Sequence, residues 1–181
     1  MQKKSSSPFD KIPPFDAESG DLNVIVDTPK KSRNKYAFDE KLGLFVLKGV
    51  LAVGHFFPFD FGFIPNTLGG DGDPLDVLVL MDEPAFVGCL VPARLVGVIE
   101  ADQTERDGKI ERNDRLLAVA ANSRVHQDVK SINDLNETLL GEIEHFFVSY
   151  NEAKGKRFKP LGRFAAQKAK KIVEDGMKIK R

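Results

Sequence analysis

The sequence predicts an α+β fold that is predominantly β, in which an antiparallel β-barrel is flanked by C-terminal helices. Between residues 22 and 121, short apolar and β-branched runs alternate with turn-forming residues, a pattern typical of strands. From Ser131 onward, apolar residues recur at a helical spacing instead. Many short strands followed by helices favour a sheet that closes on itself and is packed by those helices.

The predicted strands share alternating or β-branched apolar residues bounded by turn formers. They comprise residues 22–27, 36–38, 43–48, 75–81, 90–99 and 116–121. A hairpin-like turn is expected at residues 106–109, which contain an Asp-Gly pair. Residues 55–63 place five phenylalanines around Pro58 and Gly62, and we interpret them mainly as hydrophobic core.

Two helices are expected after the strands. Ser131 and Asp134 resemble a capping box, and apolar residues follow at a helical spacing. These apolar residues are Leu135, Leu139, Ile143, Phe146, Phe147 and Tyr150. The pattern predicts one amphipathic helix that ends before Gly155. A second, shorter helix is expected over about residues 164–173, with its lysines on a solvated face.

The first 20 residues differ in composition from the rest of the chain. Lysines, serines and prolines dominate there, and such a segment buries too little apolar surface to order itself. We therefore expect residues 1–20 to form a flexible N-terminal arm and residues 21–181 to form a single domain. The total of 181 residues is enough for one domain to bury about 70% of its unfolded surface.

Charge and cysteine content narrow the class of protein. The 27 basic and 27 acidic residues cancel, so neither nucleic acid nor an anionic membrane is an expected partner. Cys89 is the single cysteine, which excludes an internal disulfide and a zinc–thiolate cluster and fits a reducing cytosol. No apolar run approaches the ~20 residues that span a bilayer, and residues 1–20 lack the apolar core of a signal peptide. The expectation is a soluble, cytoplasmic protein.

An acidic loop at residues 70–76 leads directly into an apolar strand. Asp71, Asp73 and Asp76 lie within six residues. Like charges this close raise one another's pKa, a penalty that a bound cation removes, and an oxygen-only ligand set favours Mg²⁺ or Mn²⁺ over zinc. An EF-hand calcium loop is rejected, because its sixth position must be Gly and here it is Asp76. A plain turn without a ligand remains the alternative.

Three stretches carry a resemblance to a known family. The run Asp-Gly-Asp-Pro-Leu-Asp-Val from Asp71 resembles a signature of the soluble family I inorganic pyrophosphatases. Upstream, Pro29 with Ser-Arg-Asn-Lys-Tyr from Ser32, and Phe-Pro-Phe-Asp-Phe-Gly-Phe-Ile-Pro from Phe57, resemble two further family segments. The resemblance implies an OB-like five-stranded antiparallel β-barrel and Mg²⁺-dependent hydrolysis of inorganic pyrophosphate to two phosphates, with Mn²⁺ as an alternative ion. It also implies a homo-oligomer, a hexamer as in bacterial members.

The resemblance assigns roles to individual residues. Asp71, Asp73 and Asp76 match metal ligands, and the position of Asp73 also helps to deprotonate the attacking water. The positions that match phosphate-binding groups are Lys35, Lys48, Tyr150 and Lys156, and Asp27 stands where the family carries Glu. At Lys48 the family has an arginine, so a point charge replaces a bidentate fork. The simpler alternatives are a turn for Asp73, solvated surface for the lysines and core for Tyr150.

Other positions depart from the family pattern. Ala37 replaces a glutamate, Phe57 and Phe61 replace tyrosines, and Asn151 replaces a lysine. Each change removes a charge or a hydroxyl from the expected site.

The second acidic cluster of the family is also altered. Gln103 and Asn113 stand at two metal-binding aspartates, with Asp102 and Asp114 each one residue away. A slip of one residue on a strand turns a side chain to the opposite face, so Asp114 is a metal-ligand candidate only if its loop shifts inward. Arg115 matches the basic residue that follows the cluster.

Three functions therefore remain open at the sequence level. The first is an inorganic diphosphatase that uses a metal-activated water. The second is a binding protein for a phosphate compound with weakened catalysis, and the third is a hydrolase of another small phosphoanhydride. Retention of Asp71, Asp73 and Asp76 favours catalysis, whereas Gln103 and Asn113 favour the other two.

Overall fold

The computed structural model describes residues 7–180, with side chains described through residue 177. Its strands are β1 (Leu22–Thr28), β2 (Asn34–Asp39), β3 (Leu44–Val50), β4 (Asp60–Phe63), β5 (Asp76–Leu80), β6 (Leu90–Thr104), β7 (Ile110–Arg112), β8 (Arg115–Ala120) and β9 (Arg157–Ala165). Its helices are the 3₁₀ helix η1 (Ile132–Asp134), α1 (Glu137–Glu152) and α2 (Ala166–Lys180). No helix in this range is long and apolar enough to cross a membrane.

Five strands close into a ring in the order β1-β4-β5-β8-β6, because β6 pairs with β1 as well as with β8. This confirms the predicted closed, mainly β architecture. One pairing differs from the antiparallel expectation, since β5 and β8 run parallel, with Val77 opposite Leu116. Parallel neighbours need a long connection, and the chain between β5 and β8, which includes β6 and β7, supplies it.

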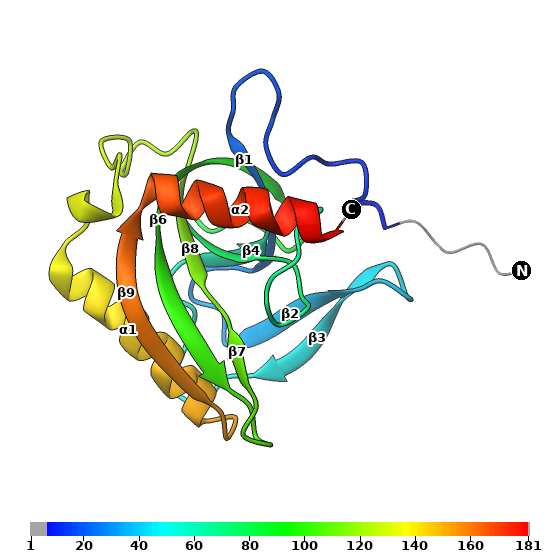
Figure 1. Ribbon diagram of the computed structural model, residues 1–181, viewed down its shortest axis with the longest axis vertical. Helices are drawn as coiled ribbons and strands as arrows, with labels where there is room; N and C mark the ends of the chain where they lie inside the picture. The colour runs from blue at the N-terminus through cyan, green and yellow to red at the C-terminus, as the bar shows by residue number, and fades with distance from the viewer. Residues whose placement is uncertain (1–6, 181) are drawn as a thin grey trace, which may run out of the picture.

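The β2–β3 hairpin forms a separate two-stranded sheet beside the ring, with Phe38 opposite Phe45. Figure 1 shows the turn end of this hairpin pointing away from α1 and β9, while its other end lies near the end of α1. Helix α2 lies across β6, and α1 lies beside β9. The helices therefore cover part of the ring and leave the side towards the hairpin open.

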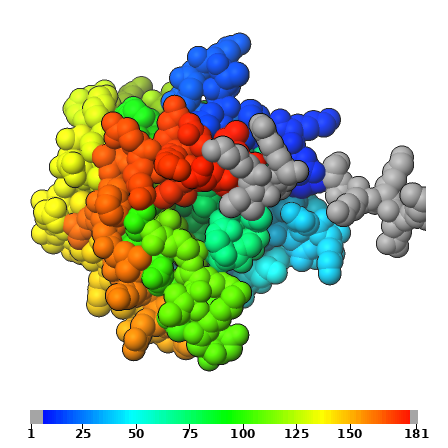
Figure 2. All heavy atoms as spheres, in the orientation of Figure 1, coloured from blue at the N-terminus to red at the C-terminus, as the bar shows by residue number. Residues whose placement is uncertain are grey.

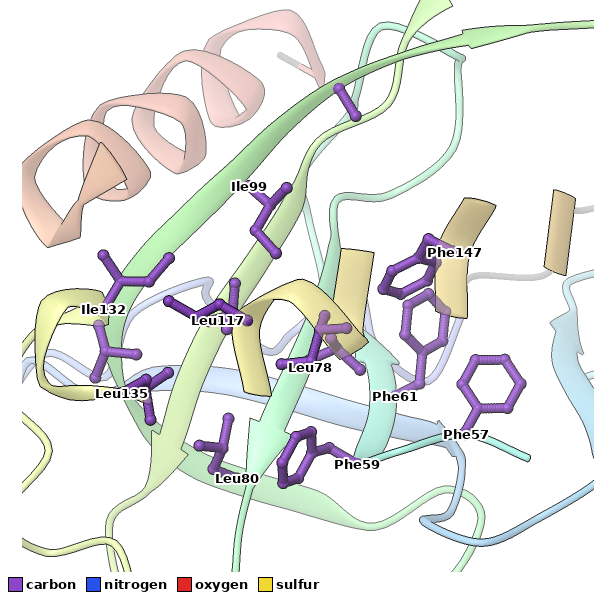
Figure 3. Packing of buried hydrophobic residues seen from close by; sticks show 14 of the residues in the cluster. Phe57, Phe59, Phe61, Leu78, Leu80, Ile99, Leu117, Ile132, Leu135 and Phe147 are labelled. Atoms are coloured by element: carbon purple, nitrogen blue, oxygen red, sulfur yellow. The ribbon is translucent and has the colours of Figure 1, made fainter. Parts of the chain in front are cut away.

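Alternating residues of the ring strands feed two apolar clusters. Leu78 and Leu80 of β5 belong to one cluster, whereas Val77 and Val79 belong to the other. The first cluster also receives Ile143 and Phe147 from α1, and Figure 3 shows Phe147 directed towards Phe61 within it. The second cluster receives Ala169 and Val173 from α2. The two-residue period of the strands thus lets one sheet bury both faces.

Several boundaries differ from the sequence expectations. The Ser131–Asp134 capping box is present, but it caps η1, and α1 begins only after a new N-cap, Asn136, whose side chain accepts from the Thr138 amide at 2.8 Å. Strand β9 was not predicted, and the expected start of the last helix at residue 164 is wrong because β9 continues to Ala165. Pro160 argues against a strand in the sequence, because proline cannot donate to a sheet. In the structure Pro160 lies beside a register shift in the pairing of β9 with β6.

The N-terminal segment also differs from the loose arm expected for residues 1–20, of which residues 1–6 lie outside the described range. The Phe9 ring lies 4.7 Å from the ring of Phe38 and 5.5 Å from that of Phe63, measured between centroids. The side-chain amide of Asn66 donates to the carbonyls of Phe9, Asp10 and Ile12 at 3.2, 3.0 and 2.9 Å. Residues 9–12 are therefore fixed against the ring and the hairpin by contacts distant in sequence.

Candidate active site

A pocket of about 580 Å³ opens between the hairpin, the acidic loop, the ring strands and the end of α1. Six of the sequence candidates line it, namely Asp71, Asp73, Asp76, Lys35, Tyr150 and Lys156. In Figure 2 the segment around residue 70 lies at the surface between the cyan hairpin and the green turn after β6. The fold thus brings together groups from β2, the loop before β5, α1 and the segment after α1.

The acidic loop is held by short-range hydrogen bonds and glycines. An Asp71 carboxylate oxygen accepts from the Asp73 amide at 3.2 Å, and the Gly69 amide donates to the Asp73 carbonyl at 2.7 Å. Gly72 has a φ of 87°, which favours glycine. At Gly70 a Cβ would lie 3.1 Å from the Arg112 carbonyl oxygen, so the loop packs closely on that residue. This geometry presents the carboxylates at the start of β5.

Asp76 is the most deeply placed of the loop carboxylates. Its Oδ2 lies 2.6 Å from Nη1 of Arg115, whose side chain is only 5% exposed. Burial raises the pKa of Asp76 to about 6, while Arg115 opposes the rise. The guanidinium carbon lies 4.8 Å from the centroid of the Phe147 ring. Burial likewise raises the pKa of Asp71, so both carboxylates are in surroundings that disfavour their charge.

Lys35 projects from β2 and pairs with Asp27 of β1, with Nζ 2.7 Å from Oδ1. Both side chains are largely buried, and the ammonium lies 4.4 Å from the centroid of the Phe61 ring. Burial raises the pKa of Asp27, and Lys35 counteracts it. Phe61, where the resemblance led us to expect a tyrosine, thus offers a ring face to the lysine in place of a hydroxyl.

Tyr150 lies on the last turns of α1, stacked on Phe146 with ring centroids 5.7 Å apart. Its hydroxyl accepts a hydrogen bond from the Lys154 ammonium. Burial raises the pKa of Tyr150 to about 12, so the hydroxyl stays protonated near neutral pH. Lys156, past the helix end, lies 2.6 Å from Glu105 of the turn after β6. Tyr150 is therefore partly core, as its alternative proposed, and also lines the pocket.

The second cluster is made of amides on the pocket side. Gln103 and Asn113 line the pocket, and the Asn113 amide donates to Gln103 Oε1 at 3.2 Å. Asp102 faces Arg112 across 3.8 Å. Asp114 accepts from the Ala101 amide at 3.0 Å and lies 2.6 Å from Arg112, in a separate pocket of about 180 Å³ that shares Asp71 and Asp76. Asn113 and Asp114 form the short connection between β7 and β8, in which Asn113 lines the main pocket and Asp114 is held outside it by Arg112.

Lys48 is the other candidate that the main pocket does not include. It lines an adjoining pocket of about 350 Å³ together with Lys35, Tyr150 and Lys154. These three shared residues form the boundary between the two pockets. Lys154 and Glu105 are pocket residues that sequence reasoning missed, because a single lysine or glutamate in a polar segment gives no local signal of its partners.

The residues present fit a hard divalent ion better than a transition metal bound by nitrogen or sulfur. The candidate ligands Asp71, Asp73 and Asp76 offer carboxylate oxygens only, and two of them are in surroundings that a cation would relieve. Within the described range, however, no group of three His, Cys, Asp or Glu side chains is arranged as a ready metal cluster. Arg115 instead partners Asp76.

Comparisons with known proteins agree with the sequence motifs. The family model described as inorganic pyrophosphatase matches residues 24–180. The inorganic pyrophosphatase of Synechocystis is 42% identical over 91% of this chain and 95% of its own length, and that of Nostoc is 39% identical over the same shares. The structure is similar to the inorganic pyrophosphatases of Thermus thermophilus (TM-score 0.84, 31% identity, 98% and 99% of the two chains) and Neisseria gonorrhoeae (TM-score 0.84, 30% identity, 95% and 98%). The chain therefore belongs to the soluble family I inorganic pyrophosphatases.

Proposed function

We propose that this chain is an inorganic diphosphatase, which hydrolyses pyrophosphate to two phosphates with Mg²⁺, or alternatively Mn²⁺, as its cofactor. The observation that carries the proposal is the pocket itself, in which carboxylates from the acidic loop face Lys35, Lys156 and Tyr150. A polyanionic substrate needs cations between itself and carboxylates, together with donors for its outer oxygens. This pocket offers both kinds of group.

Each group has a distinct task in the proposed reaction. Asp71 and Asp76 would hold the ion, which when bound supplies charge neutralisation and lowers the pKa of a water towards 7. Asp73, on the exposed part of the loop, accepts a proton from the attacking water. Lys35, Lys156 and Tyr150 donate to phosphoryl oxygens, and Lys48 does so from the adjoining pocket. Asp114 is a ligand candidate from the side of Asp71 and Asp76.

One observation favours a second candidate, the hydrolysis of another small phosphoanhydride. Gln103 and Asn113 hydrogen-bond to each other, and Asn113 also accepts from Arg115, so these amides are engaged with protein partners. Amides are weaker ligands than carboxylates for a hard ion, and fewer bound ions would alter the preferred substrate.

Phosphate release measures both candidates directly. We expect the full chain to release phosphate from pyrophosphate with Mg²⁺ or Mn²⁺, to stop when EDTA is added, and to act far more slowly on ATP and tripolyphosphate. Turnover of pyrophosphate without a divalent ion would overturn the metal dependence. Faster release from ATP or tripolyphosphate would favour the second candidate.

Variants of the acidic loop separate its members. Asp71→Asn and Asp76→Asn should weaken metal binding, so a higher Mg²⁺ concentration should recover part of the lost rate. Asp73→Asn should lower kcat by roughly 10² to 10⁴-fold without such rescue, the usual contribution of a positioned base. Rate is measured against Mg²⁺ concentration for all three variants. Equal rescue of all three would assign Asp73 as an ordinary ligand.

The proposal also includes the oligomeric state and the cellular location of the protein. A homo-oligomer, a hexamer by resemblance, is supported by exposed apolar side chains on the hairpin and the loop after it. These are Leu44, Leu47, Val50, Val53 and Phe56. Light scattering coupled to size exclusion tests the oligomeric state, and a monomer at micromolar concentration would overturn it.

A cytoplasmic location is supported by the unpaired thiol of Cys89, and imaging of a fluorescent fusion tests this location.

A further inference from the structure

Four cationic side chains line the main pocket, and three of them are already paired. Lys35 pairs with Asp27 at 2.7 Å, Arg115 with Asp76 at 2.6 Å, and Lys156 with Glu105 at 2.6 Å. Lys154 is the fourth, and it has no carboxylate partner among residues 7–177. Its ammonium lies 3.8 Å from the centroid of the Tyr150 ring and donates to the Tyr150 hydroxyl. An ammonium has three donors, so most of its hydrogen-bonding capacity is free.

The backbone of Lys154 is fixed on both sides. Its carbonyl accepts from Nε of Arg106 at 2.7 Å, and its amide donates to the Asn151 carbonyl at 2.9 Å. Gly155, with a φ of 72°, turns the chain immediately afterwards. Lys154 also lies where the main and the adjoining pockets meet. The residue is exposed, so its ammonium is placed at this wall by the contact with the ring and hydroxyl of Tyr150.

The neighbouring residue Asn151 carries no charge and does not offer a free donor to the pocket. Asn151 is 3% exposed, and its side-chain amide donates to the Phe147 carbonyl at 2.8 Å, which uses the group within α1. Lys154 is the nearest described cation along the chain that keeps free donors at this wall of the pocket.

The electrostatic surroundings of Lys154 also favour a bound anion. Desolvation of the ammonium, together with repulsion from Lys35, Lys156 and Arg115, lowers the pKa of Lys154 to about 8. A cation held among other cations without a counter-charge is unfavourable, and a bound anion relieves that cost.

We propose that Lys154 binds an outer phosphoryl oxygen of the substrate, next to the Tyr150 hydroxyl, and that it is the main free cation through which this pocket recognises pyrophosphate. This assignment deepens the proposed diphosphatase function and rests on it. The ammonium would donate to one terminal phosphoryl group, while Lys35 and Lys156 approach from the other walls. Because Lys154 has no carboxylate partner among residues 7–177, binding of the substrate to it breaks no ion pair.

The test compares three full-length variants. Lys154→Met removes the charge, Lys154→Arg keeps it, and Lys170→Met removes a charge from an exposed position of α2 as a control. We expect Lys154→Met to raise the KM for pyrophosphate by about 10 to 100-fold, as befits loss of a hydrogen bond to a charged group, with a smaller effect on kcat. Lys154→Arg should recover most of that loss, and Lys170→Met should match wild type.

A second measurement keeps the inference independent of turnover. Calorimetry with methylenediphosphonate, which is not hydrolysed, in the presence of Mg²⁺ should show the same loss of affinity in Lys154→Met as the KM does. Wild-type affinity and KM in Lys154→Met would overturn the role of Lys154, as would a fall in kcat alone. A wild-type protein that binds the diphosphonate through Lys154 but does not hydrolyse pyrophosphate would instead overturn the proposed function.

Discussion

The charged form of Lys154 is disfavoured in the folded protein, so the stability of the protein should depend on pH through this side chain. The pKa of Lys154 is lowered to about 8 in the folded protein, against 10.5 for an unperturbed lysine. Between these values the unfolded chain binds more protons, so the stability of the wild type should rise, through this group, as pH increases from about 8 to 10.5. Tyr150, whose pKa is raised to about 12, stays protonated over this window.

Lys154→Met lacks this titration. The difference in free energy of unfolding between wild type and Lys154→Met should therefore move in favour of the wild type as pH rises from about 8 to 10.5. Urea unfolding of both proteins without phosphate or metal, at several pH values, measures the difference. A difference that stays constant over this range would show that Lys154 has an ordinary pKa.

Lys35 contributes to stability as well as to the proposed site. Lys35→Ala leaves the buried carboxylate of Asp27 without its partner at 2.7 Å, and we expect a loss of about 1–3 kcal/mol in free energy of unfolding. The double variant Asp27→Asn with Lys35→Ala removes both charges and should recover part of that loss. Chemical denaturation of the single and double variants gives the coupling, and purely additive effects would contradict the pairing.

At the level of elements, the N-terminal segment joins the β2–β3 hairpin to the ring. Phe9 contacts Phe38 of the hairpin and Phe63 of β4, whereas the hairpin shares no sheet with the ring. The family match begins only at residue 24, so this segment lies before it. Because β2 carries Lys35, the packing of Phe9 bears on the geometry of the pocket.

Truncation of Phe9 tests this connection. Phe9 is half-buried, so Phe9→Ala should lower the free energy of unfolding by about 1–2 kcal/mol, less than the 3–5 kcal/mol of a fully buried Phe. Phe86→Ala is the matched control, since Phe86 is 72% exposed and should cost little. Urea unfolding compares them, and equal losses would show that residues 7–20 do not brace the hairpin.

At the scale of the whole molecule, the ring contains a close approach between β1 and β4, two of its five strands. A Cβ at Gly62 of β4 would lie 2.2 Å from the Ile25 carbonyl oxygen of β1. Gly62→Ala should therefore cost at least about 3 kcal/mol, because the clash is with backbone that cannot rotate away.

Gly141→Ala on α1 is the opposite control. A Cβ there meets nothing within 4 Å, and alanine should stabilise the helix by about 0.5–1 kcal/mol. Thermal unfolding of both variants is the measurement. If the Gly62→Ala protein were as stable as wild type, β1 and β4 would lie farther apart at Gly62 and Ile25 than this structure shows.

The sequence by itself determined the local features. Alternation of apolar residues placed β1, β3, β5 and β8 close to their observed bounds, helical spacing located α1, and the loop from Asp71 to Asp76 identified the family. These features succeed because each depends on neighbours along the chain, either through the two-residue and 3.6-residue periods or through a contiguous motif. The alternation of β6 likewise placed Gln103 and Asp102 on opposite faces, whereas Asn113 and Asp114 lie in the connection between β7 and β8.

Only the tertiary structure decided which distant groups meet. The parallel pairing of β5 with β8, the edge strand β9 and the anchoring of Phe9 come from packing, and no local pattern encodes them. The same holds for the ion pairs, since Arg115 meets Asp76 only because β8 and β5 become neighbours, and Lys35 of β2 meets Asp27 of β1. Lys154 is left as the unpaired pocket cation among residues 7–177. The sequence shows which side chains are charged, but not which charges neutralise one another. That depends on which strands become neighbours when the whole chain buries its apolar surface.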